Sequence, residues 1–150
     1  MKRPSVFEAA GGAEAFLALA TAHHLRCLAD PMLEHPFSHP GHPDHIARLA
    51  AYWGEVLGGP PAYSAVGGSE PAMLHIHARN DAPAEMGARF TACFVAAMDD
   101  AGLPDDPELR ACLRAYMEWA EGQVMAYAPK AAVVPGDATI PRWSWDCLQA

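Results

Sequence analysis

Residues 84–101, AEMGARFTACFVAAMDDA, form the stretch of sequence that decides the fold class. Its large apolar residues recur at steps of three and four positions, so they share one face of a helix. Gly102 and Pro104 follow and are typical of a helix end. The apolar stripe consists of Met86, Phe90, Cys93, Phe94, Ala97 and Met98. This periodicity predicts an amphipathic helix that is buried along one side.

Other segments on both sides of this stretch show the same helical periodicity. Asp44 and Ser69 stand where helix caps are expected. No segment alternates as a half-buried strand does, so the predicted fold class is all-α, ending in an extended tail. The sequence predicts further long helices over 13–29, 45–57 and 107–128, and short ones over 5–10 and 70–77.

Composition places the chain among ordinary globular proteins. Its 150 residues suit one domain, and 51% of them are hydrophobic. A formal net charge of −8 argues against binding to nucleic acid or to anionic lipid, since both require clustered Lys and Arg. We find no secretory leader and no apolar run of about 18 residues that could span a bilayer. We therefore expect a cytoplasmic protein with reduced thiols, and we interpret Cys27, Cys93 and Cys112 as core residues.

The eight histidines all lie within the first 77 residues. A function that depends on histidine would therefore use this half of the chain.

Several short motifs occur in a distinctive order and spacing. Together they resemble the second group of truncated haemoglobins, over roughly residues 6–128. The motifs are Phe7-Glu8-Ala9-Ala10-Gly11-Gly12, then Leu28-Ala29-Asp30-Pro31-Met32-Leu33 leading to Phe37, then Tyr52-Trp53 before Gly58-Gly59-Pro60 and Tyr63-Ser64, and finally Met73-Leu74-His75-Ile76-His77-Ala78.

The resemblance implies a two-over-two helical sandwich that holds haem b between two helix pairs. It implies a truncated globin domain over 1–128 and a C-terminal extension over 129–150. It also implies binding of O2, CO, NO or similar ligands at a pentacoordinate or weakly hexacoordinate iron. Oxygen binding or transport, and haem-dependent oxidoreductase chemistry on nitric oxide or peroxide with a reductase partner, both remain open at this stage.

The family spacing selects His77 as the iron ligand. His75 and His77 point about 200° apart on a helix, so only one of them can face the haem. His77 shares a face with the apolar residues Met73 and Leu74, whereas His75 lies on the other side. We expect the second ring nitrogen of His77 to donate to a carbonyl or carboxylate. We also expect the loop from Arg79 to leave the ligand free to adjust.

On the opposite side of the haem, the resemblance places His24 and His45 in the distal pocket. His23, by contrast, is expected at the helix edge. Many relatives carry Trp where this chain has Phe90, which keeps the ring and loses the N–H donor. His24 and His45 then become the expected hydrogen-bond donors to a bound ligand.

The remaining contacts with haem are expected from apolar side chains and one cation. Arg79 could pair with a haem propionate. The apolar set is Phe37, Leu49, Trp53, Met73, Met86 and Phe90.

Two other interpretations compete with a haem site. His35, His39, His42 and His45 could bind zinc, although Pro36, Pro40 and Pro43 forbid one regular helix there. A haem-free globin-like module for protein interaction is the other, although buried histidines are a poor choice for a purely structural core. The tail with Trp143 and Trp145 is expected to pack either on its own domain or on a second subunit of a homodimer.

Overall fold

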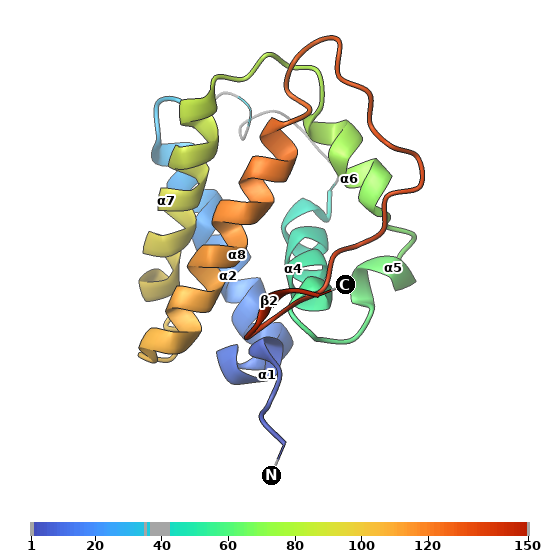
Figure 1. Cartoon of the computed structure of the whole chain (residues 1–150). Coiled ribbons are helices and arrows are strands. Elements are labelled where there is room, and N and C mark those ends of the chain that lie inside the picture. The colour runs from blue at the N-terminus through green and yellow to red at the C-terminus, as the bar shows by residue number, and fades with distance from the viewer. Residues whose placement is uncertain (1, 35, 37–42, 150) are drawn as a thin grey trace.

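The computed structural model describes residues 2–34, 36 and 43–149. Helices predominate in these residues, as the sequence predicts (Figure 1). The elements are α1 (Val6–Ala10), α2 (Gly12–Ala29), α4 (His45–Val56), α5 (Ala62–Ala65), α6 (Glu70–His77), α7 (Ala84–Asp100), α8 (Pro107–Met125), β1 (Trp143–Ser144) and β2 (Cys147–Leu148).

Local chemistry explains where several helices begin and end. The Ser69 hydroxyl accepts a hydrogen bond from the Ala72 amide at the start of α6, as predicted. Asp44 occupies the N-cap of α4, but its side chain makes no capping hydrogen bond. Its ψ of 26° lies outside the extended region in which N-cap side chains reach the helix amides. Both predicted N-cap positions are therefore confirmed, and only Ser69 supplies a capping hydrogen bond from its side chain.

Two pairs of long helices, α2 with α4 and α7 with α8, form the sandwich. Helix α2 packs against α4 and also against α7, and α7 packs against α8. Figure 1 shows α7 and α8 side by side in front of α2 and α4. This arrangement confirms the predicted all-α, two-over-two fold.

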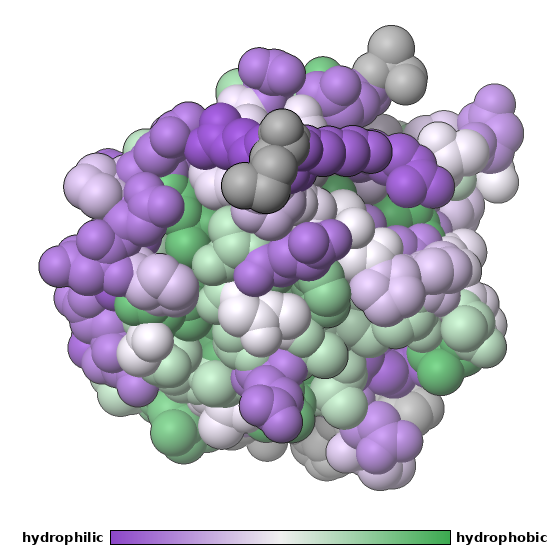
Figure 2. Space-filling view, turned by 90° about the horizontal axis from the view of Figure 1, so that it is seen from below, coloured by the Kyte–Doolittle hydropathy of each residue, from purple (hydrophilic) through white to green (hydrophobic). Residues whose placement is uncertain are grey.

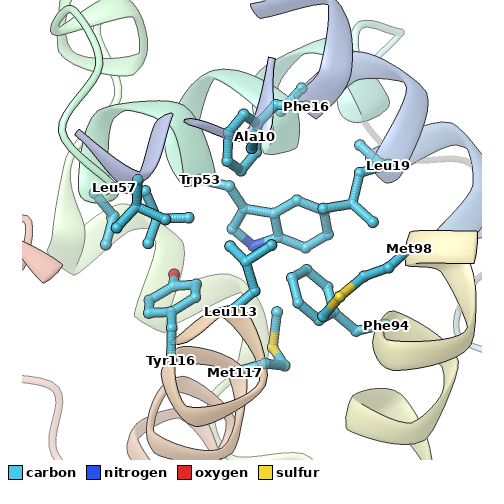
Figure 3. Close-up of a cluster of buried hydrophobic side chains, with 14 of the residues drawn as sticks. Ala10, Phe16, Leu19, Trp53, Leu57, Phe94, Met98, Leu113, Tyr116 and Met117 are labelled. Carbon is cyan, nitrogen blue, oxygen red and sulfur yellow. The ribbon is translucent and has the colours of Figure 1, made fainter. Parts of the chain in front are cut away.

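The hydrophobic core lies between the four long helices and has Trp53 of α4 at its centre (Figure 3). Trp53 is 2% exposed, and its ring meets that of Phe94 edge-on with 5.0 Å between centroids. Helices α2, α7 and α8 supply the surrounding side chains, among them Phe16, Leu19, Met98, Leu113, Tyr116 and Met117. The surface seen from below in Figure 2 mixes hydrophilic and hydrophobic residues.

Gly59 allows the turn after α4 to pack tightly. Its amide donates to the Gly54 carbonyl at 2.8 Å, and a Cβ at position 59 would lie 2.7 Å from both that oxygen and the Phe7 ring. The sequence predicts a loop after this turn, whereas the structure adds the single-turn helix α5. Four residues are too few to show helical periodicity.

The C-terminal tail packs on its own domain. It forms a two-stranded antiparallel hairpin that pairs Trp143 with Leu148. Trp143 is 6% exposed, and its ring lies 5.7 Å from that of Tyr116 on α8. The indole N–H of Trp145 donates to the Pro4 carbonyl at 2.9 Å. Both termini are therefore tied to α8 and its surroundings. No helix in the described part of the chain is long and apolar enough to cross a membrane.

Candidate functional site

The candidate iron ligand, His77, is the last residue of α6. Its Nδ1 lies 2.8 Å from the Met73 carbonyl oxygen. Because a carbonyl can only accept, Nδ1 carries the proton and Nε2 carries the lone pair. This is the tautomer that a metal ligand requires, and the Met73 carbonyl is an acceptor of the predicted kind.

The surroundings of His77 favour the neutral form of its imidazole. Burial among protein atoms lowers the pKa of this group, and the bond to Met73 opposes this in part, although the residue as a whole is exposed to solvent. A neutral imidazole in this tautomer can bind a metal ion.

A buried carboxyl group fixes the helix that carries His77. Glu70, at the start of α6, is 8% exposed and accepts a 2.7 Å hydrogen bond from the Tyr52 hydroxyl of α4. Burial raises the pKa of Glu70, and the bond from Tyr52 opposes that rise in part. Glu70 could not be identified from the sequence, because an acid after a Ser cap is also what an ordinary exposed helix start contains.

The two predicted distal histidines lie next to each other. The ring centroids of His24 and His45 are 5.7 Å apart. Burial is the main cause that lowers the pKa of His45, and the charges of His24 and His77 lower it further. His77 is thus within electrostatic reach of His45. The structure thus places an imidazole of α2 beside an imidazole of α4.

His23 is not at the helix edge, so that expectation is wrong. It is fully buried, its Nε2 donates to the Phe90 carbonyl at 3.1 Å, and its ring centroid lies 4.3 Å from that of Phe90. Burial is the main cause that lowers the pKa of His23 to about 4. His23 stands seven residues after Phe16 and four before Cys27, both buried, and this spacing is the signal that could have identified it.

The other predicted contact residues occupy different depths. Leu49, Met73, Met86 and Phe90 are half-buried at helix surfaces, whereas Trp53 belongs to the core. Phe37 lies outside the residues that the structure describes.

The loop after α6 is fixed by backbone hydrogen bonds, whereas the sequence led us to expect a loop that leaves His77 free to adjust. Arg79, which is exposed, has a left-handed φ of 59°. Its amide donates to the Tyr127 carbonyl at 2.8 Å, and the Asp81 amide donates to the Ala128 carbonyl at the same distance. The end of the His77 helix is therefore tied to the end of α8.

The alternative zinc site rests largely on residues outside the described part of the chain. His35, His39 and His42 lie there, and only His45 is placed. The described residues include no group of three His, Cys, Asp or Glu that could hold a metal ion.

Two hollows lie away from these histidines. One, of about 520 Å³, separates α5 and the start of α6 from the tail and includes Glu70. The other, of about 780 Å³, runs along the outer side of α2 past Leu17 and Leu25. Neither contains a residue that the sequence predicts to contact haem.

Comparison with known proteins agrees with the fold described above. The family model described as "Bacterial-like globin" matches residues 5–124. No curated protein gives a significant match. The fold is similar to that of a thermostable hemoglobin from the actinobacterium Thermobifida fusca, at 27% identity and a TM-score of 0.66 over 90% of this chain and 100% of that one.

Two other solved structures are similar. A hemoglobin from Chloroflexus aurantiacus is 25% identical with a TM-score of 0.69, over 81% of this chain and 98% of that one. The group II truncated hemoglobin from Bacillus anthracis is 21% identical with a TM-score of 0.72, over 86% and 95% respectively. The last likeness concerns the fold alone.

Proposed function

Because the chain belongs to the bacterial-like globin family, we propose that it is a haem-binding globin in which His77 is the iron ligand. The observation that carries the proposal is the Nδ1 contact of His77 with the Met73 carbonyl, which leaves Nε2 with the lone pair that binds iron. A haem-free module would not need an imidazole held in this tautomer. The family match likewise favours haem over zinc.

The proposed group is haem b. Covalent attachment of haem uses a C-x-x-C-H motif, and the four cysteines of this sequence form no such pair. Met73, Leu49, Met86, Phe90, Phe37 and Trp53 are the proposed apolar contacts. Arg79 is the proposed partner of a propionate, because a guanidinium pairs well with a carboxylate.

The iron of the bound haem supplies coordination of O2, CO or NO. The protein contributes the orientation of His77 and the polarity of the opposite side. His24 and His45 offer imidazole N–H donors there, whereas Phe90 offers none. A hydrogen bond that involves a charged partner contributes about 1.5–3 kcal/mol, so these histidines would set how long a ligand stays.

We also propose how this site serves the cell. Oxygen binding or transport needs only reversible binding, whereas oxidoreductase chemistry on nitric oxide or peroxide needs electrons from a reductase. We propose a cytoplasmic location for either role.

The proposed globin domain covers residues 1–128, and residues 129–150 form a C-terminal extension.

Absorption spectra of the purified protein in its ferric, ferrous and CO-bound forms test the proposal. We expect an intense band in the near ultraviolet that shifts with CO. His77→Gly should lose haem or need added imidazole, since the substitution removes the only proposed protein ligand. His75→Gly is the matched control, because His75 is exposed two positions away on the same helix, and its spectra should not change. The reverse result would contradict the assignment, and a colourless protein that never takes up haem would contradict the function.

A further inference from the structure

Two cysteines that are distant in the sequence meet between α2 and α7. Cys27 is fully buried on α2, and Cys93 is half-buried on α7. The two helices pack against each other, and the ion pairs Arg26–Asp100 and Arg89–Asp30 join them on either side of these cysteines. The effect of each thiol on the pKa of the other agrees with this placement. The sequence alone suggests only two separate core residues here, so the pairing is a finding of the structure.

Cys27 lies next to the buried imidazole of His23. Its sulfur is 3.5 Å from Nε2 and 3.9 Å from Nδ1 of that ring. Because Nε2 donates its proton to the Phe90 carbonyl, Nδ1 carries the lone pair. Cys27 is therefore linked through one side chain to the backbone of Phe90, a residue of the proposed haem pocket.

Access differs between the two sulfurs. Cys93 is partly open to solvent, whereas Cys27 is closed off. Burial raises the pKa of both thiols, and the charge of Asp30 raises that of Cys93 further, while Arg26 and Arg89 oppose it. Both groups are thus protonated at neutral pH. Oxidation should begin at Cys93, slowly, and should become faster as the pH rises.

We propose that Cys27 and Cys93 are a redox-active dithiol pair, which peroxides oxidise to a disulfide. Hydrogen peroxide first oxidises the Cys93 thiol to a sulfenic acid, and its O–O bond breaks to release one water. The Cys27 sulfur then attacks the sulfenic sulfur, so that an S–S bond forms and the S–O bond breaks. The leaving hydroxide takes the Cys27 proton and departs as a second water. The two thiols together lose two electrons, and the peroxide gains them.

This inference does not rest on haem, because the pair needs only peroxide. A covalent bond between α2 and α7 closes a long loop of the chain, which restricts the unfolded state. The oxidised protein should therefore unfold at a higher temperature than the reduced one. Reduction by dithiothreitol should reverse the change.

The test treats the full-length wild-type protein with hydrogen peroxide, followed by mass mapping of non-reduced peptides. A second protein carries Cys112→Ser and Cys147→Ser, so that only the proposed pair remains. We expect both thiols to disappear together, a peptide linking Cys27 to Cys93, and a rate that increases between about pH 7 and pH 9. Adding Cys93→Ser to the second protein should abolish the linkage and the rise in unfolding temperature.

Three results would overturn the proposal. The first is Cys93 oxidised to sulfinic acid without linkage, because a partner within reach would intercept the sulfenic acid. The second is linkage only between molecules. The third is a Cys27–Cys93 link that forms only in denaturant. Mapping of the wild-type protein decides the matter even if the doubly substituted protein fails to fold.

Discussion

Acid should destabilise this protein partly through one buried histidine. His23 has a pKa of about 4 in the folded protein against 6.5 for a free imidazole. At pH values between these two pKa values, His23 is protonated in the unfolded chain and neutral in the folded protein. The contribution of His23 to stability is therefore full above about pH 6.5 and declines as the pH falls toward about 4. The whole difference is about 3 kcal/mol, of which about 2 kcal/mol is lost between about pH 7 and pH 5.

His23→Gln isolates this effect, because the Gln amide can still donate to the Phe90 carbonyl but does not titrate. The assay is chemical unfolding of both proteins at several pH values, with the difference in free energy of unfolding plotted against pH. Taking the difference between the two free energies of unfolding cancels the contributions of the other titratable groups, which both proteins share. The charges of His24 and His45, which face His23, also lower its pKa and remain in the variant. Parallel stability curves for the two proteins from pH 7 to pH 5 would refute the reasoning.

Three other predictions follow from the contacts described above. Replacing His24 and His45 together by Leu should speed O2 release by about ten- to hundredfold in stopped-flow experiments, and a change below about threefold would contradict their role as donors. Tyr52→Phe leaves the buried Glu70 carboxyl without its donor and should lower the free energy of unfolding by about 1–3 kcal/mol in chemical denaturation. Trp143→Ala should lower it by about 3–5 kcal/mol in the same assay, and an unchanged stability would mean that the tail does not pack on α8.

The helices could be predicted from the sequence because their apolar stripes are long and their ends are marked by Gly and Pro. The predicted range 107–128 overshoots α8 by three residues, since the chain continues in turns through Ala128. The hairpin of the tail escaped prediction because strands of two residues are too short to show alternation.

The site was predictable to the extent that helix faces decide it. The proximity of His24 and His45 agrees with the common placement that the family resemblance implies. The burial of His23 was not predicted. Adjacent residues on a helix point only about 100° apart, and both His23 and His24 border the apolar face of α2. The Glu70–Tyr52 bond joins separate helices, and Cys27 and Cys93 come together only because α2 packs on α7, so both pairings depend on tertiary packing that periodicity does not encode.

The backbone contacts of Arg79 and Asp81 also determine how the C-terminal end of α6 can unfold. Both residues are exposed, yet their amides are bonded to Tyr127 and Ala128. Amide hydrogens in such a loop normally exchange with solvent almost at once, whereas these two can exchange only when the contact with the end of α8 breaks. The loop and the last turn beyond α8 thus form one cooperative unit of local unfolding. A chain shortened to residue 125 would lose both acceptor carbonyls, and the helix bearing His77 would fray from its C-terminal end.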